Sequence, residues 1–129
     1  MTPLLRYKTV QVKTSTPGEL LIMLYDGLFR FMDEALVAMR ADDRARAGDR
    51  ISRAHEILSE LAATLNKSAA PELCENLEAL YFFCMHRLVE ANLYRDPERI
   101  AECKRVLEPL REGFRSAVQE TLQMRQAAP

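Results

Sequence analysis

Apolar residues recur at helical spacing in four separate stretches of the chain. In residues 17–40 they return every three or four positions, which is the period of one face of an α-helix. The same period runs through residues 43–66, through residues 71–94, and again from residue 97 toward the C-terminus. The pattern therefore predicts four amphipathic helices joined by short connections.

Three of these stretches begin with a start signal. Thr16 can cap the first helix, Pro17 suits a first helical position, and Glu19 follows the cap by three residues, as in a capping box. Pro71 also suits a first helical position, and the pair Asp96-Pro97 repeats the signal of a cap followed by proline. These signals fix where the first, third and fourth helices should start.

Helices of about 20 residues with short connections pack antiparallel. The predicted fold is therefore all-α, an antiparallel up-and-down four-helix bundle in which residues 17–126 form one domain. Pro109 lies within the last helix and should bend or stop it, because proline removes a backbone hydrogen bond. The chain beyond Met124 should fray. The predicted inward positions are Leu20, Leu24, Leu28, Phe31, Ala35, Met39, Ala47, Ile51, Ala54, Ile57, Leu58, Leu61, Leu65, Leu73, Leu77, Leu80, Tyr81, Cys84, Leu88, Ala91, Ile100, Cys103, Leu107, Leu110, Phe114 and Val118.

Residues 1–16 do not share the helical pattern. Val10 and Val12 are β-branched, alternate with polar residues, and have no second strand with which to pair. With Tyr7 they form an apolar side that favours contact with the bundle. We expect a short extended N-terminal arm or lid in which Tyr7, Val10 and Val12 bind the bundle or a partner.

Two helices carry more apolar residues than one core stripe needs. The additional residues are spaced at helical intervals in two rows, Ile22, Phe29 and Leu36 on the first helix and Phe82, Val89 and Leu93 on the third. They could belong to a broad bundle interior, to a homodimer seam, or to a groove for an amphipathic partner segment, and six methionines favour an adaptable groove. We expect both rows to bind a partner.

Charge and cysteine content narrow the class of protein. The chain has 18 basic and 19 acidic side chains, a net charge of −1, so neither nucleic acid nor an anionic membrane is an electrostatically favoured partner. No apolar run approaches the roughly 20 residues needed to span a bilayer, and no signal peptide is recognisable. Three widely spaced cysteines fit free buried thiols in a reducing compartment. We expect a cytosolic protein.

The chain contains no recognisable catalytic or metal-binding motif. His55-Glu56 resembles the start of a zinc protease motif, but Ser59 occupies the position of the second histidine. Cys84 and His86 lie about 200° apart around a helix and cannot share an ion. We therefore expect no enzyme activity, no metal and no cofactor. A bundle that carries a ligand or metal, and a structural homo-oligomer, remain the alternatives to a partner-binding bundle.

The order of short motifs along residues 7–115 resembles the FliS family of bacterial flagellar export chaperones. The likeness is carried by Tyr7, by Val12-Lys13-Thr14, by Thr16-Pro17-Gly18-Glu19-Leu20, by Met23-Leu24-Tyr25-Asp26-Gly27, by Ile57 and Leu61, by Asn76-Leu77 with Leu80-Tyr81, by Arg87-Leu88, by Ala91-Asn92 and by Asp96. Phe114 departs from the pattern, since the family often has tryptophan there.

The resemblance implies a function in the cytosol. Members of this family hold the C-terminal segment of flagellin, which is disordered in the free subunit and would otherwise drive premature polymerisation. The segment wraps around the chaperone in a largely extended form with helical pieces, and the loaded chaperone docks on a protein of the flagellar type III export gate. The resemblance thus implies that flagellin and an export gate protein are the partners.

Overall fold

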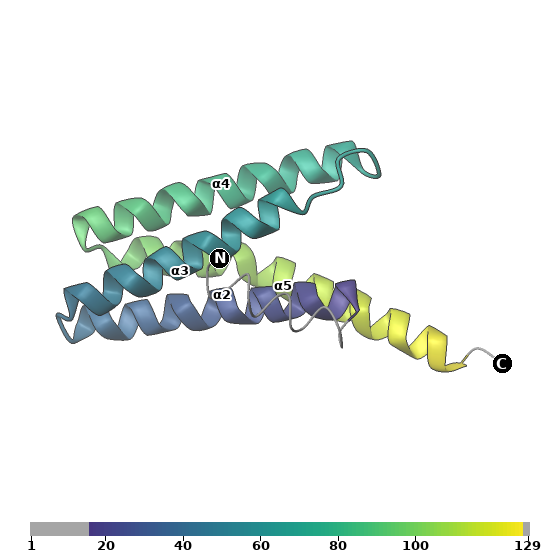
Figure 1. The fold of residues 1–129 in the computed structure, drawn as a ribbon, viewed down its shortest axis with the longest axis horizontal. Helices are drawn as coiled ribbons and strands as arrows, with labels where there is room; N and C mark the ends of the chain where they lie inside the picture. Colours follow the sequence, from purple (N-terminus) through teal and green to yellow (C-terminus); the bar gives the residue numbers. More distant parts are fainter. Residues whose placement is uncertain (1–15, 128–129) are drawn as a thin grey trace.

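The computed structural model describes residues 16–127, which form four α-helices: α2 (Pro17–Arg40), α3 (Arg44–Ala63), α4 (Pro71–Tyr94) and α5 (Pro97–Ala127). Successive helices run in opposite directions (Figure 1). Helix α2 packs against α3 and α5, and α4 packs against the same two helices. The predicted all-α, antiparallel four-helix bundle is confirmed, whereas the predicted arm lies outside the described residues apart from Thr16.

The helix starts follow the predicted signals. The Thr16 hydroxyl oxygen accepts the Glu19 backbone N–H at 3.1 Å, so the cap of α2 forms as expected. At the start of α5 an Asp96 carboxylate oxygen accepts the Glu98 N–H at 3.0 Å. Helix α3 begins after Asp43, whose carboxylate accepts the Arg46 N–H at 3.1 Å. Each cap satisfies a backbone donor that the helix itself leaves free.

The buried residues within 16–127 are all classed as hydrophobic, and most predicted inward positions are buried. Leu28, Leu58, Leu88 and Leu107, one from each helix, are each 0% exposed. Such a side chain stabilises the fold by about 1.5–3 kcal/mol. Cys74, Cys84 and Cys103 are buried free thiols, as predicted. The further inward residues that are buried are Leu24, Ala35, Ala47, Ile51, Ala54, Ile57, Leu61, Leu77, Tyr81, Ala91 and Ile100.

The structure differs from the expectations at Leu73 and along the C-terminal half of α5. Leu73, predicted to face inward, is 56% exposed, because the first turns of α4 direct Cys74 and Leu77 inward instead, at 5% and 6% exposed. Pro109 does not stop α5, which continues as a helix through Ala127 and beyond the expected fraying point at Met124. Pro109 and Arg105 are both exposed, so the Arg105 carbonyl that loses its helical partner can bond to water.

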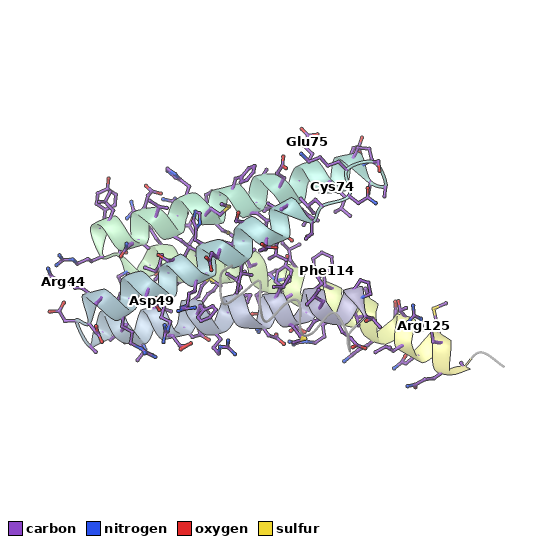
Figure 2. The ribbon with its side chains drawn as sticks, in the orientation of Figure 1. Arg44, Asp49, Cys74, Glu75, Phe114 and Arg125 are labelled. Carbon is purple, nitrogen blue, oxygen red and sulfur yellow. The ribbon has the colours of Figure 1, made fainter. Side chains whose placement is uncertain are left out.

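The helices lie closer together at one end of the bundle, which we call the closed end, than at the other, which we call the open end. Toward the α3–α4 connection, α3 and α4 diverge from α2 and α5, and the last turns of α5, which carry Arg125, project past the other helices (Figures 1 and 2). At this open end α2 and α5 stay close because Gly18 has no side chain. A Cβ atom at Gly18 would lie 3.0 Å from a Val118 methyl.

Candidate functional site: an apolar cleft at the open end of the bundle

The open end contains an apolar cleft of about 350 Å³, which we call the open-end cleft. All four helices and the α3–α4 connection contribute to its wall. The lining residues are Pro17, Leu20, Leu21, Leu24, Leu61, Thr64, Leu65, Asn66, Leu77, Tyr81 and Phe114. Six of these eleven side chains are leucines, so the cleft suits the apolar face of a peptide segment rather than a charged ligand.

Helix length explains why the cleft exists. Helix α3 has 20 residues, whereas α2 and α4 have 24 and α5 has 31. Past Ala63 the inward stripes of the three longer helices therefore lack a fourth helix to cover them. Leu65, after the end of α3, closes this gap only in part and is half-buried. An apolar surface remains that another chain can cover.

Two tyrosines form the polar centre of this region. The hydroxyl oxygens of Tyr25 and Tyr81 lie 2.5 Å apart, and the two side chains are 0% and 1% exposed. The Tyr25 ring also contacts the Phe114 ring, with centroids 5.6 Å apart. Burial, and then the hydrogen bond to Tyr81, raise the pKa of Tyr25, and burial raises the pKa of Tyr81. Both phenols are therefore neutral at physiological pH.

The predicted row on α4 lies on the surface. Phe82, Val89 and Leu93 are 52%, 52% and 68% exposed, and we call these three residues the α4 outer face. Glu75, which lies about two turns before Phe82 on α4, also points away from the bundle (Figure 2). The expectation that helix α4 is apolar on two sides is confirmed. The role of these residues in binding a partner stays a prediction.

The predicted row on α2 is not an open surface, and the expectation for Phe29 is wrong. Phe29 is 4% exposed, because the Arg111 guanidinium of α5 covers its ring with the guanidinium carbon 4.1 Å from the ring centroid. Arg111 is held there by Asp26, at 3.6 Å, and by Glu108, at 3.1 Å. Ile22 and Leu36 are half-buried, and Leu36 packs against the core.

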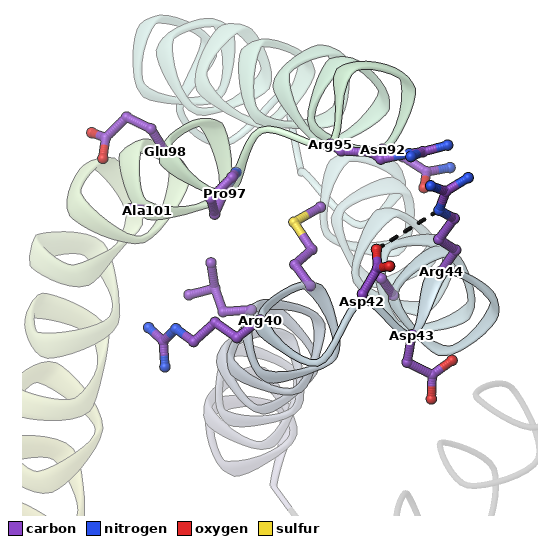
Figure 3. A pocket seen from close by; sticks show the side chains of 12 residues that line it. Arg40, Asp42, Asp43, Arg44, Asn92, Arg95, Pro97, Glu98 and Ala101 are labelled. Atoms are coloured by element: carbon purple, nitrogen blue, oxygen red, sulfur yellow. Dashed lines mark ion pairs between the residues drawn. The ribbon is translucent and has the colours of Figure 1, made fainter.

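A second pocket, of about 550 Å³, lies at the closed end (Figure 3). Its floor includes Leu36 and Met39. Its rim balances three basic against three acidic side chains, namely Arg40, Arg44, Arg95, Asp42, Asp43 and Glu98. Because Arg40 points outward on one side while Arg44 pairs with Asp42 at 3.8 Å on the other, the rim does not concentrate charge of one sign. We assign no ligand to this pocket.

The expectations about the N-terminal arm, a metal site and a membrane span can be compared with the structure only for residues 16–127. Tyr7, Val10 and Val12 lie outside this part of the chain. Within it, no group of three or more His, Cys, Asp or Glu side chains could hold a metal ion. The same residues include no helix that is long and apolar enough to cross a membrane. His86 is exposed on α4, where it lies 3.7 Å from Glu90.

The sequence patterns place the cleft leucines on core stripes but do not reveal that a cleft separates them. Leu20, Leu61 and Leu77 have the same period as fully enclosed residues such as Leu28. Leu21 was not among the predicted inward residues at all. The one available signal was the run Thr64 to Ala70, whose polar and small residues end α3 before its neighbours end. A shorter helix in a bundle indicates an uncovered end.

Together, the fold and the open-end cleft define a small four-helix bundle with a preformed apolar cleft at one end. Comparison with known proteins then identifies the family. The family described as flagellar protein FliS matches residues 1–121, so the chain belongs to the FliS family.

Several relatives share much of the sequence, and each is named flagellar secretion chaperone FliS. The relative from Bacillus subtilis (strain 168) is 35% identical over 117 residues, which cover 91% of this chain and 86% of the relative. The relative from Campylobacter jejuni is 33% identical over 109 residues, or 84% and 85% of the two chains. The relative from Salmonella typhimurium is 30% identical over 105 residues, or 81% and 78%.

Proposed function

We propose that this protein is a cytosolic export chaperone that binds the C-terminal segment of flagellin, prevents its premature polymerisation and helps deliver it to a protein of the flagellar type III export gate. The observation that carries this proposal is membership of the FliS family, whose relatives are named flagellar secretion chaperones. The open-end cleft supports it, because an apolar cleft suits a segment that must be kept from assembling.

The open-end cleft is the principal binding surface in this proposal. An amphipathic segment inserts apolar side chains between Leu21 of α2 and Leu65 after α3, in the mode by which helical grooves take peptide anchors. A volume of about 350 Å³ accommodates a few side chains, not a whole segment. The remaining contacts must lie elsewhere on the bundle.

The α4 outer face provides the second contact. Tyr81 lines the cleft and Phe82 lies next to it on the solvent side of α4, so a segment leaving the cleft around α4 meets Phe82 and then Val89. An extended segment covers about 3.3 Å per residue. A path along four turns of α4 therefore needs only about 7 residues of extended chain, since each turn rises about 5.4 Å.

Binding of this kind couples folding to association. A disordered segment becomes ordered when it binds, and the ordering costs roughly 2–5 kcal/mol or more of the contact energy. The affinity therefore stays reversible in spite of a large contact area. A chaperone that must release its subunit for export needs such reversibility.

Residues 1–16 are proposed to act as a lid. Tyr7, Val10 and Val12 would cover part of the flagellin site in the empty chaperone and leave it on loading, so that Tyr7 becomes available to the export gate protein. A population closed for 90–99% of the time requires only about 1.4–2.7 kcal/mol. Burial of one tyrosine and one valine supplies free energy of that order.

A homodimer is the competing occupant of the α4 outer face. Two copies could pair through Phe82, Val89 and Leu93, with no flagellin involved. Sedimentation velocity at several protein concentrations distinguishes a homodimer from a face that is free to bind flagellin. A mass that rises with concentration and returns to the monomer after Phe82→Glu would favour the homodimer seam.

Suppression of flagellin polymerisation tests the function directly. Purified flagellin is seeded to form filaments with and without an equimolar amount of this protein, and the pelleted fraction is measured. The protein should keep flagellin in the supernatant, and Leu21→Glu in the cleft should restore pelleting, whereas the exposed control Ser52→Glu should not. Unchanged pelleting with the folded parent protein would refute the proposal.

A further inference from the structure

The paired tyrosines beside the cleft leave one hydrogen without an acceptor. Each phenol has one O–H hydrogen, and a single bond between the Tyr25 and Tyr81 oxygens, 2.5 Å apart, uses only one of the two. Within residues 16–127 no other residue shares a hydrogen bond with either hydroxyl. A buried donor without an acceptor is costly, so the second hydrogen calls for a partner from outside these residues or for water.

The position of the two rings indicates which hydroxyl holds the spare hydrogen. Tyr81 lines the open-end cleft, whereas Tyr25 does not and is enclosed behind it against Phe114. Either hydroxyl can be the donor of this pair. With the enclosed Tyr25 as the donor, the Tyr81 hydrogen remains free beside the cleft that Tyr81 lines.

The other polar groups of the cleft do not duplicate this donor. The Thr64 hydroxyl already donates to the Leu61 carbonyl oxygen at 2.9 Å. Asn66 is exposed, and its side-chain oxygen accepts the Ser68 hydroxyl at 2.7 Å. Tyr81 is thus the buried donor in a wall that is otherwise mainly leucine.

We propose that Tyr81 is a specificity-determining residue that donates its spare O–H to a main-chain carbonyl oxygen of the segment bound in the open-end cleft. This inference rests on the proposed function, because it assumes that the cleft takes the flagellin segment. A carbonyl in an extended stretch or in the last turn of a helix lacks a helical N–H partner and is therefore the acceptor that gains most from this donor. We expect the bound segment to present such a carbonyl to the cleft.

The two tyrosines provide a matched pair of variants. Tyr25→Phe and Tyr81→Phe each remove one oxygen and break the same hydrogen bond, so both should lower stability to a similar degree. They differ in the cleft: Tyr25→Phe keeps the Tyr81 donor, whereas Tyr81→Phe removes it. The double variant Tyr25→Phe/Tyr81→Phe leaves no unpaired hydroxyl and guards against failure of the single Tyr81 variant to fold.

Affinity for a synthetic C-terminal flagellin segment, measured by calorimetry, tests the inference. Tyr81→Phe and the double variant should bind roughly five- to tenfold more weakly than the parent, as for loss of one hydrogen bond, and Tyr25→Phe should stay within about twofold. With ¹³C-labelled main-chain carbonyls in the segment, the infrared band of one carbonyl should shift on binding to the parent and to Tyr25→Phe, but not to Tyr81→Phe.

Three results would overturn the inference. If Tyr25→Phe weakens binding as much as Tyr81→Phe, the pair has only a structural role. If neither variant weakens binding although the parent binds, the segment does not use this donor, and the proposed function still stands. If the folded parent does not bind the segment, the proposed function itself fails, and this inference fails with it.

Discussion

Replacing Phe29 and Phe82 by alanine removes the same atoms from two very different environments. Phe29 is 4% exposed beneath the Arg111 guanidinium, and Phe82 is 52% exposed on the opposite side of the bundle core. In the sequence both residues belong to a row of additional apolar positions, and periodicity does not distinguish them. The two substitutions therefore separate what periodicity predicts from what packing determines.

The expected losses of folding stability differ severalfold between Phe29→Ala and Phe82→Ala. Truncation of a buried phenylalanine costs about 3–5 kcal/mol, which includes the cavity that it leaves. Of this, the contact with Arg111, whose side chain is 22% exposed, contributes about 0.5–1 kcal/mol. Phe82→Ala should cost about 1 kcal/mol or less, because water already covers half of its ring. For a chain of this length, about 3–5 kcal/mol lowers the melting temperature by roughly 10–20 °C.

Urea unfolding followed by far-ultraviolet circular dichroism measures both costs, and the chain lacks tryptophan, which makes the helical signal the suitable probe. Phe82→Ala should also weaken binding of the flagellin segment by roughly tenfold, about 1.4 kcal/mol, if the α4 outer face contacts it. The reasoning about Phe29 is refuted if Phe29→Ala unfolds within about 1 kcal/mol of the parent.

Three further outcomes are expected. Gly113→Ala should stabilise the protein by about 0.5–1 kcal/mol in thermal unfolding, since a Cβ atom there meets no atom within 4 Å. Gly18→Ala should gain less stability, because its Cβ atom would be crowded by Val118. Equal gains in the two variants would contradict this packing. Raising the pH above about 10 should lower the free energy of unfolding by up to about 1.4 kcal/mol per pH unit for each of Tyr25 and Tyr81. The reason is that their pKa values in the folded protein are raised above 10.0, so the unfolded chain loses those protons first. A Tyr25→Phe/Tyr81→Phe variant whose stability falls with the same slope argues against this. Deleting residues 1–14 should tighten binding of the flagellin segment by roughly tenfold or more in calorimetry, whereas weaker binding would mean that the arm grips the segment.

Local chemistry made the fold predictable from sequence. Thr16, Pro71 and Asp96 specify helix starts through short-range hydrogen bonding and backbone geometry, and the structure has α2, α4 and α5 begin at those places. The inward stripes were predictable for the same reason, because a helical period needs no knowledge of the neighbours. The stop at Pro109, one of its two expected effects, does not occur; the cost of the missing hydrogen bond depends on whether the freed carbonyl meets water, which the sequence does not state.

The candidate site was less predictable, because it depends on how the helices pair. Phe82 and Phe29 share a periodicity argument, yet only Phe29 lies beneath an arginine that approaches from another helix. Likewise, Leu65 and Leu77 look like ordinary core residues until the early end of α3 leaves them beside a cleft. Both distinctions are tertiary: they arise from contacts between residues far apart in the chain.

Calorimetric titration of the intact protein with the isolated C-terminal segment of flagellin tests the central claim most directly. The account predicts one-to-one binding with a large negative heat-capacity change, because a disordered segment buries apolar surface in the open-end cleft and on the α4 outer face. Leu21→Glu should abolish most of this heat while the bundle stays folded. No heat at any temperature, with the bundle folded and the segment intact, would contradict the account.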